Sequence, residues 1–192
     1  MTITTYQTYD VTPIIGWGHT SLVFAISENT AVKVIRDDSL YKNCNPERFF
    51  EKGLETQKLF YESEIAVPRP YGILEVTLKH ETSQEDIMSG TRVGLVMQRL
   101  HGFKGSSATG DLRKKLEDLL RVEKERALAL EYIPCNGLIN TVYVPDEDRL
   151  YFIDLCDWIN FSTWSNERRR DHRLPENNEI YEQKKKTPGM RI

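Results

Sequence analysis

The segment that decides the fold is TPIIGWGHTSLVFAISENTAVKVIRD, Thr12–Asp37, in which β-rich runs alternate with turn residues. SLVFAI and TAVKVI contain the β-branched and aromatic residues typical of strands, and SENT between them has the composition of a hairpin turn. A glycine-bearing turn around Gly16 and Gly18 precedes the first of these runs. We therefore predict three consecutive strands in this segment.

Two amphipathic helices are predicted after it. The first covers roughly residues 46–63, with Asn45 as its cap and Pro46 at its first helical position. Its apolar residues are Phe50, Leu54 and Leu59. The second begins at Asp111, a predicted cap, and continues through DLRKKLEDLLRVEKERALALEY. Its apolar residues recur on one side: Leu112, Leu116, Leu119, Leu120, Ala127 and Leu130.

The remaining segments are predicted as strands and loops. AVPRPYGILEV, residues 66–76, is extended because its prolines exclude helix. The polar stretch 79–91 is a loop insertion before the strand VGLVMQRL, HGFKGSSATG is a flexible connector, and NTVYV and RLYFID form a hairpin around PDED. The order predicts an α+β plan: an antiparallel sheet carrying one helix, joined to a mostly helical part.

Composition and charge exclude some classes of function. The chain has 192 residues, 39% of them hydrophobic, and a net charge of −3, which argues against a dedicated nucleic-acid binder. From Glu167 onward, eight Lys or Arg stand against five acids, so this tail is net +3. A basic tail can bind phosphate or anionic lipid, and a simply solvated tail is the alternative.

The cysteines and the amino terminus indicate where the protein works. Cys44, Cys135 and Cys156 are scattered, without a CxxC pair, so we predict neither a disulfide framework nor a zinc site. MTITTYQTYD lacks the features of a secretory signal, and no apolar run approaches 18 residues. We expect a cytoplasmic or otherwise intracellular protein with no membrane span.

The order of these elements resembles the protein-kinase-like superfamily, in the compact style of aminoglycoside phosphotransferases and RIO-type kinases. The resemblance runs from about Ile14 to Trp158. It implies a two-lobe fold, with an N-lobe over residues 1–100, a reduced helical C-lobe over 101–165 and a charged tail over 166–192.

GWGHTSLV, Gly16–Val23, is similar to the family's glycine-rich loop. The resemblance implies that Gly16 and Gly18 let the backbone approach the phosphates and that Val23 covers the base. Ser21 stands in the place of the third glycine. Read without the resemblance, the same residues are an ordinary hairpin turn.

AVKVI places Lys33 inside an apolar strand, where an unpaired ammonium is costly. The resemblance implies that Lys33 contacts the α- and β-phosphates and pairs with a Glu on the following helix. Glu55, in ETQKLFYESEIAVPRP, is our choice for that Glu, and Glu51 is the alternative. Lys33 pointing to solvent from an edge strand is the other possibility.

GLVMQRLHG resembles the strand and hinge between the two lobes. Met97 would then be the gatekeeper, and backbone groups of Gln98 and Leu100 would bind the adenine edge. Ala31 would lie over the base together with Val23. A core strand that binds no nucleotide is the alternative.

IPCNGLIN and DLC align with the catalytic loop and the metal-binding motif of the family. Asn140 and Asp154 keep the two metal-binding positions, and their oxygens suit Mg²⁺. Cys135 stands where the catalytic Asp belongs. A thiol is a poor substitute for a carboxylate that accepts a proton, because it is mostly protonated at neutral pH.

We therefore expect a protein that binds ATP and Mg²⁺, and a pseudokinase or weakly active atypical kinase with a protein partner or substrate. The first alternative is an active phosphotransferase that acts on protein or small-molecule hydroxyls. The second is a non-catalytic scaffold that binds through its basic tail.

Overall fold

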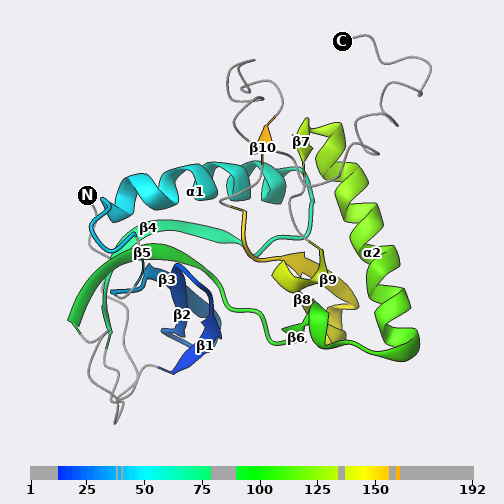
Figure 1. Ribbon diagram of the computed structural model, residues 1–192, viewed down its shortest axis with the longest axis horizontal. Helices are drawn as coiled ribbons and strands as arrows, with labels where there is room; N and C mark the ends of the chain where they lie inside the picture. Colours follow the sequence, from blue (N-terminus) through cyan, green and yellow to red (C-terminus); the bar gives the residue numbers. More distant parts are fainter. Residues whose placement is uncertain are drawn as a thin grey trace. The chain divides into compact units, whose positions relative to one another are not determined.

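The structure is a computed structural model that describes residues 13–37, 39, 41–78, 90–133, 137–155 and 159–160 (Figure 1). Residues 79–89 of the predicted loop insertion, Cys135 and the basic tail lie outside these ranges, whereas Gly90 and Thr91, predicted as the end of that loop, are strand residues. By its contacts the chain divides into Met1–Ile159 and Asn160–Ile192. Everything described below belongs to the first unit, except the second residue of the short strand β10, Ile159–Asn160. The lobe boundaries near residues 100 and 165 stay predictions.

Five antiparallel strands form the main sheet, in the order β1-β2-β3-β5-β4. The first three are the strands predicted from the opening segment: β1 (Ile14–Trp17), β2 (Ser21–Ala25) and β3 (Thr30–Ile35). The other two are β4 (Pro70–Leu78) and β5 (Gly90–Gln98). The sheet of the α+β prediction is therefore confirmed.

The two faces of this sheet differ, because successive side chains of a strand point to opposite faces. One face carries an apolar core: Leu22, Phe24, Ile26, Val32, Val34, Val76, Leu78 and Val96. The other face carries Lys33, which lies opposite Val23 on β2 and Leu95 on β5. Lys33 is therefore a central-strand residue, and the edge-strand alternative is wrong.

α1 (Pro46–Glu62) begins and ends close to the predicted helix, and it packs against β4 and β5 (Figure 1). Asn45 caps it, since its side chain accepts a hydrogen bond from Arg48 N at 3.2 Å. The buried side differs in part from our prediction, because Leu59 is exposed while Phe60 is buried. The buried residues of α1 are Phe50, Gly53, Thr56, Gln57 and Phe60.

The second half of the chain builds a small sheet and a long helix. Its strands β6, β8 and β9 form a three-stranded sheet in the order β6-β8-β9. The elements in chain order are β6 (Phe103–Lys104), a 3₁₀ turn (Gly105–Ser107), α2 (Gly110–Ala129), β7 (Tyr132–Ile133), a 3₁₀ turn (Leu138–Asn140), β8 (Thr141–Val144), a 3₁₀ turn (Pro145–Glu147) and β9 (Arg149–Phe152).

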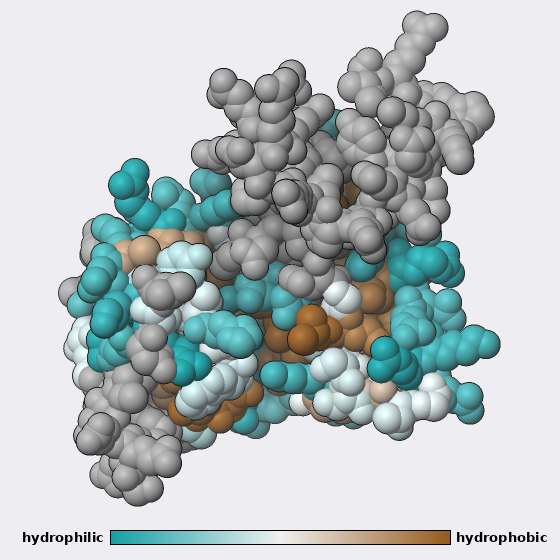
Figure 2. All heavy atoms as spheres, viewed as in Figure 1, coloured by the Kyte–Doolittle hydropathy of each residue, from teal (hydrophilic) through white to brown (hydrophobic). Residues whose placement is uncertain are grey.

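Two details of this half correct our predictions. The segment 101–110 is not only a flexible connector, because it contains β6 and a 3₁₀ turn. The cap residue of α2 is Thr109 rather than Asp111, which lies in the first turn and contributes its charge there. Figure 2 shows hydrophilic side chains gathered over the outer side of α2. Within the described ranges, neither α1 nor α2 combines the length and apolar character that crossing a bilayer requires.

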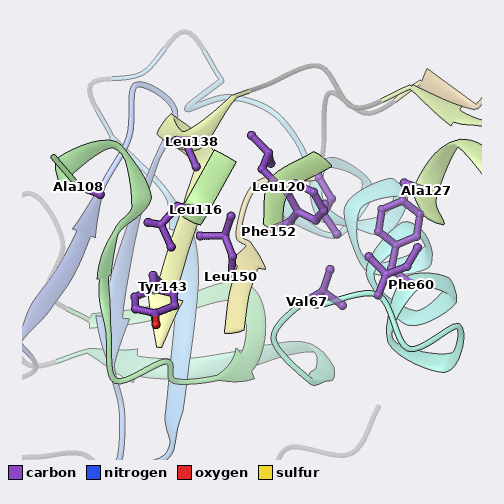
Figure 3. Close-up of a cluster of buried hydrophobic side chains, with 12 residues drawn as sticks. Phe60, Val67, Ala108, Leu116, Leu120, Ala127, Leu138, Tyr143, Leu150 and Phe152 are labelled. Carbon is purple, nitrogen blue, oxygen red and sulfur yellow. The ribbon is translucent and has the colours of Figure 1, made fainter. Parts of the chain in front are cut away.

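A second core joins the end of α1 to α2 and to the β8–β9 hairpin (Figure 3). The predicted apolar side of α2 faces this core, with Leu116, Leu120 and Ala127 buried. Phe60 and Val67 enter it from α1 and from the segment that follows. The end of α1 and the segment after it therefore pack into the core of the second half, while the five-stranded sheet has its own core.

The segment between α1 and β4 is also held by polar contacts from the second half. Ala66 N donates to Glu123 Oε2 on α2 at 3.1 Å, and Phe152 N on β9 donates to Ala66 O at 2.8 Å. Glu123 is buried, and its other oxygen accepts from Arg126 at 2.9 Å. Arg149 donates to the carbonyl oxygen of Glu64 at 2.9 Å. These bonds fix the path of the chain between the two halves.

We predict that Glu123→Ala lowers the free energy of unfolding by about 1–3 kcal/mol, because the buried N–H of Ala66 loses its acceptor. Glu123→Gln keeps an acceptor oxygen and should lose less. Urea unfolding followed by circular dichroism measures both. The matched control is Glu125→Ala on the same helix, which removes only an exposed ion pair with Arg121. Equal losses for Glu123→Ala and Glu125→Ala would contradict the role of Glu123.

Candidate functional site

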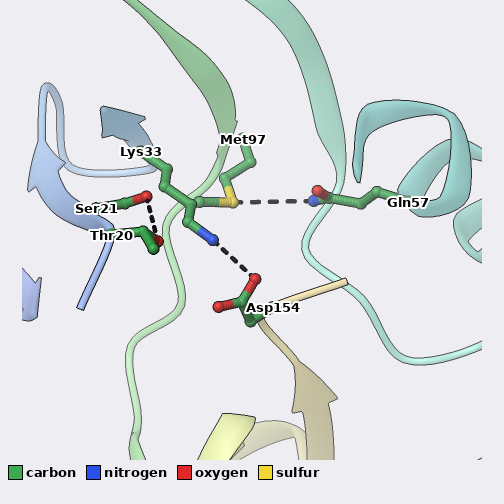
Figure 4. A network of polar contacts seen from close by, with 6 residues as sticks. All are labelled: Thr20, Ser21, Lys33, Gln57, Met97 and Asp154. Carbon is green, nitrogen blue, oxygen red and sulfur yellow. Dashed lines mark hydrogen bonds and ion pairs between the residues drawn. The ribbon is translucent and has the colours of Figure 1, made fainter. Parts of the chain in front are cut away.

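Lys33 and Asp154 form the centre of the candidate site. Lys33 Nζ lies 2.9 Å from Asp154 Oδ1, although the two residues are 121 positions apart in the sequence (Figure 4). The side chain of Lys33 is 9% exposed and that of Asp154 is 35% exposed. A buried ammonium needs such a partner, and the half-exposed carboxylate leaves the pair open to a ligand.

The register of the hairpin places Asn140 beside Asp154. Asn140 comes directly before β8 and Asp154 follows shortly after β9, so both lie at the same end of this antiparallel pair. Ile153 N donates to Asn140 O at 3.0 Å, which ties the two segments together. The structure thus brings the two predicted metal-binding residues into neighbouring positions.

This donor set fits Mg²⁺. The described residues contain no group of three or more His, Cys, Asp or Glu side chains arranged for a metal. Mg²⁺ is usually bound through one or two carboxylates together with substrate phosphates and water, rather than by a cage made only of protein. One carboxylate and one amide oxygen, from Asp154 and Asn140, are consistent with that kind of site.

The turn between β1 and β2 adjoins Lys33. Gly18 N donates to Ser21 O at 2.9 Å, which closes the turn, and the hydroxyls of Thr20 and Ser21 lie 3.2 Å apart (Figure 4). A side chain at Gly16 would bring its Cβ to 3.1 Å from Val23 Cβ, so this glycine allows close packing of β1 on β2. Among the described residues no acceptor takes the N–H of His19 or Thr20.

Apolar residues continue the Lys33 face of the sheet toward the end of β5. Ala31 lies opposite Met97 in the β3–β5 pairing, and both are buried. Val23 is half-buried on the neighbouring strand. Val23 and Ala31 are the residues predicted to lie over an aromatic base and Met97 is the predicted gatekeeper, and all three share one face of the sheet with Lys33.

The hinge residues differ in what they can offer a ligand. Gln98 N donates to Arg69 O at 2.9 Å, and the Gln98 side chain accepts from Arg69 N at 3.2 Å. The N–H of Gln98 is therefore already used within the protein. In the described part of the chain the N–H of Leu100 has no acceptor, so it is the backbone donor left for a ligand.

The structure does not bring Glu55 or Glu51 to Lys33. Both carboxylates are on the exposed side of α1, and neither is a partner of Lys33. The polar side chain that α1 directs inward is Gln57, which is 4% exposed. Its Nε2 donates to Pro68 O at 2.7 Å and approaches Met97 Sδ at 3.9 Å (Figure 4).

Sequence reasoning missed Gln57 although a signal was present. Gln57 follows Phe50 by seven residues and precedes Phe60 by three, so it lies on the same side of the helix as these buried aromatics. Reading the helix from Phe50 and Phe60, rather than from Leu54 and Leu59, would have placed Gln57 inside and Glu55 outside.

Two surface hollows lie away from Lys33. One, of about 420 Å³, is lined by the exposed side of α2, including Lys114 and Asp118. The other, of about 620 Å³, is lined by residues around Gln98 and Tyr151. Burial, and then a hydrogen bond to Glu147, raises the pKa of Tyr151 to about 12, so this phenol stays neutral at ordinary pH. The geometry around Lys33 is the stronger indication of a functional site, because charged and apolar groups of predicted roles converge there.

Comparisons with known proteins agree with this geometry at the level of the fold. No protein-family model and no curated protein matches the chain. A solved structure of a Stt7 homolog from Micromonas algae, soaked with ATP, is similar with a TM-score of 0.55 at 15% identity, over 78% of this chain and 49% of that one. WbdD, solved with the kinase inhibitor LY294002, is similar with a TM-score of 0.47 at 15% identity, over 91% of this chain and 41% of that one.

The chain spans half or less of the length of these two structures. The likeness to the Stt7 homolog concerns the fold alone, since the two chains are only 15% identical. Together with the order of the elements, it establishes the architecture: the chain has a protein-kinase-like α+β fold.

Proposed function

We propose that this chain binds ATP together with Mg²⁺ on the Lys33 face of the sheet. The observation that carries the proposal is the 2.9 Å contact between Lys33 and Asp154. It joins the residue that would neutralise phosphate charge to the residue that would hold the metal. The Stt7 homolog of similar fold was solved from crystals soaked with ATP, which supports nucleotide as the ligand class.

Each residue of the site has a role in this proposal. Val23, Ala31 and Met97 enclose the base, and the N–H of Leu100 donates to its edge. Lys33 exchanges its contact with Asp154 for contacts with the phosphates. Asp154 and Asn140 are the residues that would hold Mg²⁺, which would neutralise charge on the phosphate oxygens.

We propose further that transfer of phosphate is slow or absent. This rests on the sequence, because Cys135 stands at the position of the catalytic Asp and lies outside the described residues. General-base catalysis is typically worth about 10²–10⁴ in rate, while positioning and charge neutralisation supply most of phosphoryl transfer. The chain would then act as a pseudokinase or weak kinase whose output is contact with a protein partner.

The test is a thermal-shift titration with ATP, with and without Mg²⁺. At 100 times the dissociation constant, ATP should stabilise the wild type by about 2.7 kcal/mol. Lys33→Met and Asp154→Asn should remove most of this shift, and Asp154→Asn should remove in particular its dependence on Mg²⁺. Lys114→Met and Asp146→Asn, on exposed positions, are matched controls that should keep it.

The outcomes separate the alternatives. No shift of the wild type at any ATP concentration, or an equal shift in all four variants, would refute nucleotide binding at this site. Rapid transfer of phosphate from ATP that depends on Lys33 and Asp154 would refute the pseudokinase reading and favour an active phosphotransferase.

A further inference from the structure

Arg36, directly after β3, contacts the β1–β2 turn at three places. Its backbone N donates to Thr20 O at 3.0 Å, which extends the β2–β3 ladder by one step. Its Nη1 donates to Gly18 O at 3.1 Å. Its Cζ lies 4.6 Å from the centroid of the Trp17 ring. One side chain therefore holds two successive residues of the turn, Trp17 and Gly18.

Arg36 makes these contacts on the face of the sheet opposite Lys33. Trp17 lies opposite Leu22, and Leu22 belongs to the apolar face of the sheet. Since side chains alternate between faces, Arg36 continues the row of Val34, on the face opposite Lys33. The guanidinium is thus outside the candidate site and is not itself a ligand for phosphate.

The hydrogen bond to Gly18 O has a consequence on the other side of the turn. In a trans peptide the C=O of one residue and the N–H of the next point in opposite directions. Arg36 holds the carbonyl of Gly18 toward the face of the sheet that carries Val34. The N–H of His19 is therefore directed toward the opposite face, which carries Lys33. That N–H has no acceptor among the described residues. Backbone N–H groups in such a turn are donors for phosphate.

We infer that Arg36 is a positioning residue that fixes the turn in the conformation that binds phosphate. This rests on the proposed function, in which the turn adjoins the phosphates of ATP. The guanidinium also stacks on Trp17, whose residue is 61% exposed, and this contact helps to keep it beside the turn. The inferred role is specific: it concerns the phosphates and not the base, which would lie against Val23, Ala31 and Met97.

The test compares ATP with adenosine, which lacks phosphate, by titration calorimetry. We expect Arg36→Ala to raise the dissociation constant for ATP about tenfold, the worth of one charged hydrogen bond and one cation–π contact. The dissociation constant for adenosine should stay within about twofold. An unchanged affinity for ATP, or an equal loss for both ligands, would overturn the inference.

Two further variants separate positioning from simple attraction by the positive charge of Arg36. Arg36→Lys keeps the charge but lacks the planar fork and its stacking geometry, so it should restore ATP binding only in part. Trp17→Leu keeps Arg36 and removes the ring, so it should also weaken ATP more than adenosine. Full rescue by Arg36→Lys with no effect of Trp17→Leu would overturn positioning in favour of charge.

A readout without nucleotide distinguishes failure of this inference from failure of the proposed function. Hydrogen exchange of the turn, Gly18–Ser21, should be faster in Arg36→Ala than in the wild type, while exchange in α2 stays the same. If the wild type bound neither ATP nor adenosine, the proposed function would fail. Hydrogen exchange would then still test whether Arg36 holds the turn in place. Unchanged exchange in Arg36→Ala would overturn the role of Arg36 in either case.

Discussion

Replacing Phe60 by alanine should lower the free energy of unfolding by about 3–5 kcal/mol, the usual loss for a buried phenylalanine. Phe60 is 0% exposed, and its ring packs edge-on against Tyr132 with a centroid distance of 5.1 Å. It is the residue through which α1 enters the core shared with α2 and the β8–β9 hairpin. The truncation leaves a cavity where three parts of the chain meet, and rigid backbone around it limits collapse.

Urea unfolding of the variant measures this loss, and Leu59→Ala is the matched control. Leu59 neighbours Phe60 on α1 but is 37% exposed, so its truncation should cost less than about 1 kcal/mol. If both substitutions cost the same, α1 would present a different side to the core. Because α1 carries Gln57 against Met97, Phe60→Ala should also loosen the site, seen as a weaker shift by ATP.

The strands and helices were predictable because local patterns decide them. SLVFA and TAVKVI are rich in β-branched and aromatic residues and are bounded by turn residues, which favours two paired strands. Asn45 marks the start of α1 because its side chain caps the helix. Pro46 fits the first helical position because the N–H that it lacks has no partner within the helix there. The cap of α2 was assigned wrongly, since Thr109 and Asp111 are both capping types and only the backbone decides between them.

The site was predictable only in part. Lys33, Asn140 and Asp154 were placed together by resemblance; the structure pairs Lys33 with Asp154 and bonds Asn140 to Ile153, the residue before Asp154. No local pattern could have paired Lys33 with a residue 121 positions away, because that contact depends on how the two halves pack. Glu55 was chosen from its sequence context, whereas the phase of α1 on the sheet is set by Phe50 and Phe60.

Arg36 and Glu123 were missed for a related reason. A charged residue after a strand or within an amphipathic helix is ordinarily solvated, so nothing in the sequence singles out either residue. Each acts on a backbone group of a distant segment: Arg36 donates to the carbonyl oxygen of Gly18, and Glu123 accepts from the N–H of Ala66. Such groups are present at every residue, and sequence patterns carry no information on which of them need a partner.

Gly94→Ala is the second substitution with a large expected effect, a loss of about 3 kcal/mol, at the upper end of the usual range for overpacking. Gly94 lies in the middle of β5 between Val34 on β3 and Leu74 on β4. A Cβ there would lie 2.6 Å from Lys33 O, 2.6 Å from Val32 Cγ2 and 2.8 Å from Val34 Cγ1. The backbone oxygen cannot rotate away as a side chain can, so β3 must move.

This movement links stability to the site, because the displaced carbonyl belongs to Lys33. We expect Gly94→Ala to lower the free energy of unfolding and also to reduce the thermal shift caused by ATP. Gly137→Ala is the matched control, since a Cβ at Gly137 has no atom of the described residues within 4 Å and its φ of −85° suits alanine. It should change stability by less than about 0.5 kcal/mol. Equal behaviour of the two variants would mean that β5 does not approach β3 as closely as described, and the position of Lys33 would then lose its main support.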